Sequence, residues 1–175
     1  MKRTVTLATG AALALALALG GAQAQDKKAD KQSQSFIKDA IEANYSEINL
    51  GKLAQEKAKS DSVKQYGAMM VKDHSAANEK AKSVAQQLGV EPPSGSSVME
   101  KGSYLKLKVL LGETFDRSFV NTMVSDHKAV IKEFQKESTK TDAAGQFAKD
   151  TLPTLQHHLQ EAETLHRQMQ TTGSK

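Results

Sequence analysis

One pentapeptide pattern occurs twice in this chain and ends each time in a histidine. Met-Val-Lys-Asp-His occupies residues 70–74, and Met-Val-Ser-Asp-His occupies residues 123–127. On a helix, the methionine and the histidine of each copy share one face because they lie four residues apart. A histidine that faces the interior in two helices is part of a buried polar layer or a ligand of a metal ion. The question for the rest of the chain is what would complete such a layer.

Two more ionisable residues fall on inward-facing helical positions. Glu47 lies on a seam of mostly small or apolar residues, and His158 lies on a similar seam near the end of the chain. Counted in helical rise from the expected turns, Glu47 lies level with His74, and His127 lies level with His158 to within about 5 Å. If both pairs fall near mid-height, four side chains from four helices face one another: Glu47, His74, His127 and His158.

Such a layer has two chemical interpretations, because a buried carboxylate on Glu47 costs several kcal/mol unless it is paired. In the first, neutral and protonated histidines hydrogen-bond the carboxylate without a metal. In the second, the carboxylate and the imidazoles coordinate a divalent ion, and this set suits zinc, iron or copper. Asp116, on the seam of the third helix, is an additional candidate ligand or a hydrogen-bond partner of one. Met70 and Met123 are expected in the core, although a methionine four residues from a histidine also forms a soft site that suits copper.

The first 24 residues have the pattern of a secretory signal peptide. Lys2 and Arg3 give a positive start, residues 5–19 are apolar, and Ala22-Gln23-Ala24 precedes the expected cleavage point. The apolar run is too short for a comfortable membrane span, and no later segment is apolar enough to be one. Without cysteine the chain has neither a lipid-attachment site nor a disulfide. We therefore expect an exported protein, periplasmic or secreted.

Composition and charge exclude several classes of function. The chain has 24 basic and 20 acidic residues, so removal of Lys2 and Arg3 leaves 22 basic residues and a net charge of +2. These charges are interspersed, whereas a nucleic-acid-binding protein usually has a basic face or tail. No Gly-x-Ser-x-Gly turn and no glycine-rich phosphate loop is present. Neither a nucleic-acid partner nor a hydrolase or nucleotide-dependent enzyme is therefore expected.

Helical periodicity through the rest of the chain predicts an all-α, ferritin-like four-helix bundle over residues 35–170. A polar, disordered leader is expected at 25–34 and a frayed tail at 171–175. A long crossover with a short helix, after a stop at Gly89, is expected between the second and third helices. The predicted segments are a first helix from 35 to about 59, a second from 60 or 61 to about 88, the crossover at 89–113, a third helix from 114 to about 137, and a fourth from about 142 to 169.

The order of these motifs resembles one exported bacterial ferritin-like family, the domain of unknown function 4142. The resemblance rests on Glu47 in a helix of small residues, the two pentapeptides, Phe115-Asp116, and Leu-Pro-x-Leu-x-x-His at 152–158. It covers residues 35–169 and implies a ferritin-like bundle behind a signal peptide, with no established activity. Di-iron ferritin-like proteins use Glu-x-x-His. Here the residues three before the histidines are apolar, which disfavours a di-iron oxidase: Val71, Val124 and Leu155.

Three hypotheses about function follow from the sequence. In the first, the exported bundle binds a metal ion at the Glu47/His74/His127/His158 layer and acts in storage, sensing or stress protection. In the second, the same layer only fixes the register of the helices in a metal-free structural or interaction module. These two differ in whether the side chains converge on one point. A third hypothesis, a small redox or peroxide-handling enzyme, additionally requires an open coordination position on the metal.

Overall fold

The computed structural model describes residues 30–172, without the side chains of 98–100 and 172, and the only regular secondary structure in this part of the chain is helical. The predicted all-α class is therefore confirmed. The expected signal peptide, the first half of the expected leader (25–29) and residues 173–175 lie outside the described residues. None of the described helices is long and apolar enough to cross a membrane. The helices are α1 (Lys31–Lys57), α2 (Asp61–Gln87), α3 (Val98–Lys108), α4 (Gly112–Glu137) and α5 (Ala143–Thr172).

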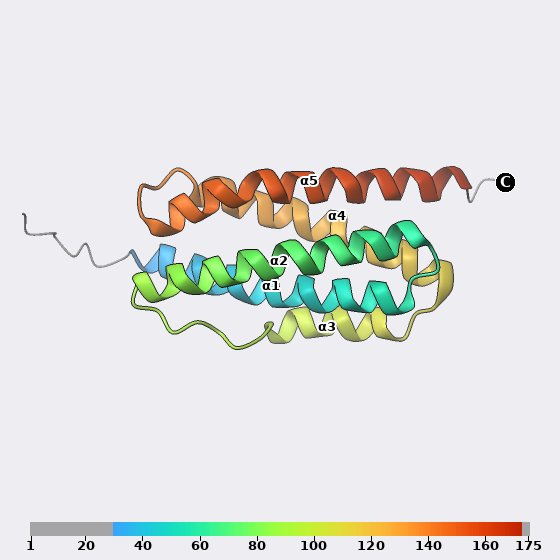
Figure 1. Ribbon diagram of the computed structural model, residues 1–175, viewed down its shortest axis with the longest axis horizontal. Coiled ribbons are helices and arrows are strands. Elements are labelled where there is room, and N and C mark those ends of the chain that lie inside the picture. The colour runs from blue at the N-terminus through green and yellow to red at the C-terminus, as the bar shows by residue number, and fades with distance from the viewer. Residues whose placement is uncertain (1–29, 173–175) are drawn as a thin grey trace, which may run out of the picture.

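The helices form a bundle of two long hairpins. A short turn joins α1 to antiparallel α2, and another joins α4 to α5 (Figure 1). The connection after α2 runs back along the bundle and contains α3, so that α2 and α4 begin at the same end and run in the same direction (Figure 1). The short helix α3 lies against α1 and α4. The four long helices thereby bring one face each to a common interior.

The end of α2 follows from a glycine, as predicted. Gly89 adopts a positive φ of 67°, which is accessible to glycine without steric cost. The Val90 amide then donates to the Ala85 carbonyl at 2.8 Å, and the Gly89 amide donates to the Gln86 carbonyl at 3.1 Å. These bonds satisfy carbonyls that the last helical turn leaves without partners.

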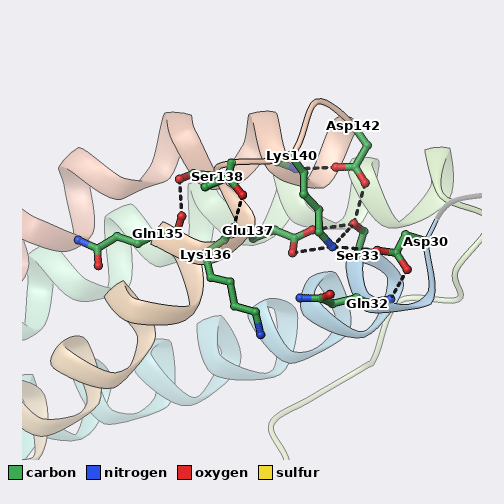
Figure 2. Close-up of polar contacts among 11 residues, drawn as sticks. Asp30, Gln32, Ser33, Gln135, Lys136, Glu137, Ser138, Lys140 and Asp142 are labelled. Atoms are coloured by element: carbon green, nitrogen blue, oxygen red, sulfur yellow. Dashed lines mark hydrogen bonds and ion pairs between the residues drawn. The ribbon is translucent and has the colours of Figure 1, made fainter.

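The beginning of α1 differs from the prediction. Residues 31–34 are helical rather than part of a leader, and the helix starts four residues before the predicted cap at Ser35. Asp30 caps it by accepting a hydrogen bond from the Gln32 amide at 3.2 Å. Ser33 is fully buried, with its Oγ 2.7 Å from Glu137 Oε1 and 2.6 Å from Asp142 Oδ2 (Figure 2).

Lys140 completes this polar cluster at the α4–α5 turn. Its Nζ lies 3.1 Å from Asp30 Oδ2, 3.0 Å from Ser33 Oγ and 3.1 Å from Glu137 Oε2 (Figure 2). The partners of the first turn of α1 are thus supplied from more than 100 residues away. A polar segment that looks like a leader in sequence is ordered because this turn satisfies its side chains.

The apolar core is divided into two clusters. One is centred on aromatic and methionine side chains near the α1–α2 turn: Tyr66, Met70, Phe115, Phe119 and Met123. The other fills the opposite half of the bundle: Ile37, Ile41, Ile131, Phe134, Phe147 and Leu155. The buried polar side chains of Asn44, Glu47, His74, His127 and His158 lie on the helices between these clusters.

Two glycines allow α1 and α2 to approach closely. A Cβ atom on Gly51 would lie 2.6 Å from the Gly67 carbonyl oxygen, and one on Gly67 would lie 2.7 Å from the Gly51 carbonyl oxygen. Real Cβ atoms do not approach backbone this closely, so both positions require glycine at this separation. Because the helices are antiparallel, the residues seven before Gly51 and seven after Gly67 face each other two turns away. These residues are Asn44 and His74.

We expect Gly67→Ala to destabilise the protein by about 1–3 kcal/mol, because the added methyl group must push α1 away from α2. Gly102→Ala in α3 is a matched control, since a Cβ there meets nothing within 4 Å. It should stabilise the protein by about 0.5–1 kcal/mol through helix propensity alone. Urea unfolding followed by circular dichroism measures both changes. Equal effects of the two substitutions would contradict the close-approach argument.

Candidate functional site: a buried layer of three histidines

Three of the four predicted layer residues converge in the centre of the bundle. His74 comes from α2, His127 from α4 and His158 from α5, and each is at most 5% exposed. Their ring centroids are 5.2 Å apart for His74 and His158, 5.5 Å for His127 and His158, and 5.8 Å for His74 and His127. Each ring offers one nitrogen to a group whose members all lie within 4.8 Å of one another.

The outer nitrogen of each imidazole faces an oxygen atom. His74 Nδ1 lies 2.8 Å from Asn44 Oδ1, and His127 Nδ1 lies 2.9 Å from the Met123 carbonyl oxygen. His158 Nε2 lies 3.0 Å from Asp73 Oδ2. A carbonyl or carboxylate oxygen only accepts, so the outer nitrogen of each ring is the one that carries hydrogen. This assigns the neutral tautomer and leaves the inner nitrogen with a lone pair.

Burial keeps the three rings neutral. Desolvation lowers the pKa of His74 well below its usual value, and the neighbouring His127 and His158 lower it further. The same two causes, burial first and then His158, lower the pKa of His127 to about 4. Burial also lowers the pKa of His158, although Asp73 opposes this effect. At neutral pH the layer therefore presents uncharged imidazoles.

The second nitrogen of each ring, on the side away from its oxygen partner, has no hydrogen-bond donor near it within residues 30–172. Among the described residues, no hydrogen-bonding partner lies within reach of His74 Nε2, His127 Nε2 or His158 Nδ1. Buried polar atoms usually have a partner, and three converging lone pairs repel one another. A cation bound between the three nitrogens would interact favourably with all three lone pairs at once.

Glu47 lies beside this group. It is 6% exposed and lines a cavity of about 10 Å³ together with Asn44, His74 and His127. This inner cavity is large enough for about one water molecule. The Glu47 carboxylate is not among the ligand atoms that lie within 4.8 Å of one another in the described part of the chain. Glu47 thus borders the histidine group from α1.

Asp116 occupies a different part of the bundle. Its carboxylate accepts hydrogen bonds from the backbone amides of Lys59 at 3.0 Å and Ser60 at 2.8 Å. It therefore stabilises the α1–α2 turn by accepting from two amides that lie just before α2 begins at Asp61. The structure does not bring it to the three histidines, because it lies about three turns before His127 on α4.

Met70 and Met123 are fully buried in the apolar cluster near the α1–α2 turn, where core residues were expected. Met123 also contributes to the layer through its backbone, because its carbonyl accepts from His127. The predicted core role of the methionines agrees with this placement.

Two residues of the site were not predicted from the sequence. Asn44 lies on the same seam as Glu47, one turn earlier, and its polarity at an inward position was the available signal. Asp73 is rotated about 100° from His74 on α2 and so looked like a flanking residue. It instead reaches His158 on the adjacent α5, and its side chain is 28% exposed. No pattern within α2 indicates that contact.

The fold and the site together define an all-helical bundle with a buried three-histidine layer. The chain belongs to the family described as a domain of unknown function, DUF4142, whose pattern matches residues 18–165. This confirms the family indicated by the motifs. No curated protein matches the chain. A crystal structure of a DUF305 fragment from Deinococcus radiodurans is similar, with a TM-score of 0.71 at 14% identity over 79% of this chain and 98% of that one. At this identity the likeness extends to the fold alone.

We expect chelator-treated protein to lose stability as the pH falls from 6.5 towards 4. The unfolded chain binds protons on its histidines below pH 6.5, whereas the folded chain resists them, so that stability rises with pH across this window. For His127, with a folded pKa of about 4, the loss amounts to about 3 kcal/mol.

Urea unfolding at pH 7.5, 6 and 5 tests this expectation. A variant with all three layer histidines replaced by glutamine is the comparison, and its stability should fall less over the same range. Parallel pH dependences for the two proteins would show that the layer does not titrate as its burial requires.

Proposed function

We propose that this protein is an exported helical bundle that binds one divalent transition-metal ion at His74, His127 and His158. The observation that carries this proposal is the convergence of three inner nitrogen lone pairs, each fixed by an oxygen on the other side of its ring. Metal-bound histidines typically donate their second ring N–H to such an oxygen, which sets the tautomer and makes the ligand more basic. The pair of Asp73 and His158 has the carboxylate–histidine arrangement typical of metal sites.

The metal-free layer is the competing function, and the hydrogen-bond pattern weighs against it. A layer that only fixes helix register would pair donors with acceptors across the bundle. Here three acceptors face one another, and a proton shared among them would have to occupy a site where burial lowers the pKa of every ring. A divalent ion supplies the missing positive charge without this cost.

The ligand chemistry favours ions that accept imidazole, namely zinc, copper and iron. Tetrahedral zinc holds its nitrogen ligands about 3.4 Å apart, given bonds of about 2.0–2.1 Å. In this structure the three ring nitrogens lie within 4.8 Å of one another. Small rotations of the imidazole rings would shorten these distances to the spacing that zinc requires. Glu47 or a water in the inner cavity would complete the coordination. Intrinsic affinity should follow the general order of copper above zinc above iron.

The order and directions of the helices support a ferritin-like interpretation of the bundle. The residues at the site indicate a metal chemistry different from that of di-iron proteins. The parallel directions of α2 and α4, with α3 in the connection that spans them, are those of a ferritin-like four-helix bundle. Val71, Val124 and Leu155 occupy the positions where a di-iron protein has glutamate. We therefore propose a single-ion site that sequesters or senses a metal in the exported compartment, rather than an iron-oxidising centre.

Metal binding is tested by titrating the mature protein with zinc, copper and iron in an isothermal calorimeter. We expect one ion per chain and a loss of affinity of at least about 100-fold in His127→Gln, because a ligand is removed. His157→Gln is the matched control, since this neighbouring histidine is exposed and should change nothing. A wild-type protein that binds none of the three ions would overturn the proposal and favour the metal-free module.

Asp73→Ala should weaken metal affinity by about 10–100-fold while leaving the three ligands in place, because His158 loses the acceptor that orients it. Asp61→Ala, at an exposed position on the same helix, removes the same charge and should have no effect on affinity. Competition with a chromogenic chelator measures both. If the two variants bind alike, Asp73 does not support the site.

A further inference from the structure

Two larger hollows adjoin the inner cavity beside the histidines. The first, of about 210 Å³, lies between α1, α3 and α4 and is bordered by Ser46, Ser103 and Asp126. We call it the α3 pocket. The second, of about 600 Å³, lies between α1 and α4 near Phe36 and Asp39, and we call it the α1/α4 groove. Both are open to solvent, so either could connect the surface with the buried layer.

The walls that separate these hollows from the inner cavity differ in chemistry. The residues that line both the groove and the inner cavity are all apolar: Ala40, Ala43, Val130 and Phe134. The residues that line both the α3 pocket and the inner cavity are Ala43, Glu47 and Val130. Glu47 is therefore the polar group that the α3 pocket shares with the cavity, and the groove has no counterpart to it among the described residues.

This difference decides which side a cation would use. A divalent ion that leaves water must exchange its hydration shell for other oxygen or nitrogen ligands, and an apolar wall offers none. A carboxylate at the wall supplies both an oxygen ligand and a compensating charge. Asp126, half-buried in the α3 pocket, adds a second negative charge on the solvent side and raises the local cation concentration.

The inner end of this path has its own indication of a ligand. His74 and His127 line the inner cavity and are at most 5% exposed. Their Nε2 atoms have no hydrogen-bond partner among the described residues. Carboxylate, carboxylate and imidazole thus follow one another from solvent to centre: Asp126, Glu47, then His74 and His127.

Resting on the proposed function, we infer that the metal ion reaches the histidine layer through the α3 pocket, with Glu47 as the relay carboxylate. Asp126 attracts the ion from solvent, Glu47 displaces some of the water molecules bound to the ion, and the imidazoles then coordinate it. The second pentapeptide thereby has two roles, because Asp126 lines the entry path and His127 coordinates the ion at its end. The first pentapeptide differs, because its Asp73 orients a ligand instead.

Stopped-flow mixing of the metal-free protein with Co²⁺, followed by its visible absorbance, measures the association rate, and mixing with excess EDTA measures dissociation. We expect Asp126→Asn to slow both rates roughly fivefold at low salt, because both directions cross the same barrier. The dissociation constant should then change less than twofold. Asp39→Asn, which removes the same charge from the α1/α4 groove, is the control and should leave both rates unchanged.

A second pair of variants tests the path by bulk instead of charge. Ser103→Phe fills the α3 pocket and should slow association at any salt concentration, whereas Ser35→Phe adds the same ring at the α1/α4 groove and should not. Circular dichroism melting shows that each variant is folded before its rates are compared.

The outcomes separate this inference from the proposed function. Slower exchange in the two α3-pocket variants alone supports the path. If the groove variants slow exchange instead, or if all four variants exchange like the wild type, the path is wrong while metal binding stands. If the wild-type protein gives no cobalt signal and binds no zinc, copper or iron, the proposed function itself fails.

Discussion

The site depends on the orientation of three imidazole rings, each of which is held by a hydrogen bond from its outer nitrogen. Each ring donates outward to a different kind of oxygen: an amide from Asn44, a backbone carbonyl from Met123 and a carboxylate from Asp73. Because a neutral imidazole has one donor and one acceptor, this fixes where the three lone pairs point. The direction of the three lone pairs follows from that one constraint, while burial keeps the rings neutral.

The rest of the bundle serves to keep this arrangement dry and in register. Apolar clusters close the interior on both sides of the layer, and desolvation by these clusters is the main cause of the lowered histidine pKa values. The contact of Gly51 with Gly67 sets the spacing of α1 and α2, and this spacing places Asn44 opposite His74. At the far end, the cluster of Ser33, Glu137 and Lys140 ties the start of α1 to the α4–α5 turn.

Helical periodicity was enough to predict the class of fold and which residues face inward. His74, His127 and His158 were placed at one level by counting residues from the turns, since rise per residue is constant in a helix. The start of α1 was predicted wrongly because its partners lie in a turn more than 100 residues away. The role of Asp73 as the acceptor for His158 was missed for a similar reason. This contact depends on how α5 is rotated beside α2, and no pattern within α2 indicates that rotation. Asp116 faces inward as its seam position suggested, but at a height where backbone amides are its partners.

The histidine layer also bears on the mechanics of a chain that has no cysteine. Its three histidines come from both hairpins, with His74 on the first and His127 and His158 on the second. An ion held by all three closes two large loops of the chain, through residues 74–127 and 127–158, as a pair of disulfides would. The ion would stabilise the folded chain by mass action, because it would bind the converged histidines and not the unfolded chain. The proposed metal centre would thus act as a removable cross-link, whose presence would set how readily the two hairpins separate.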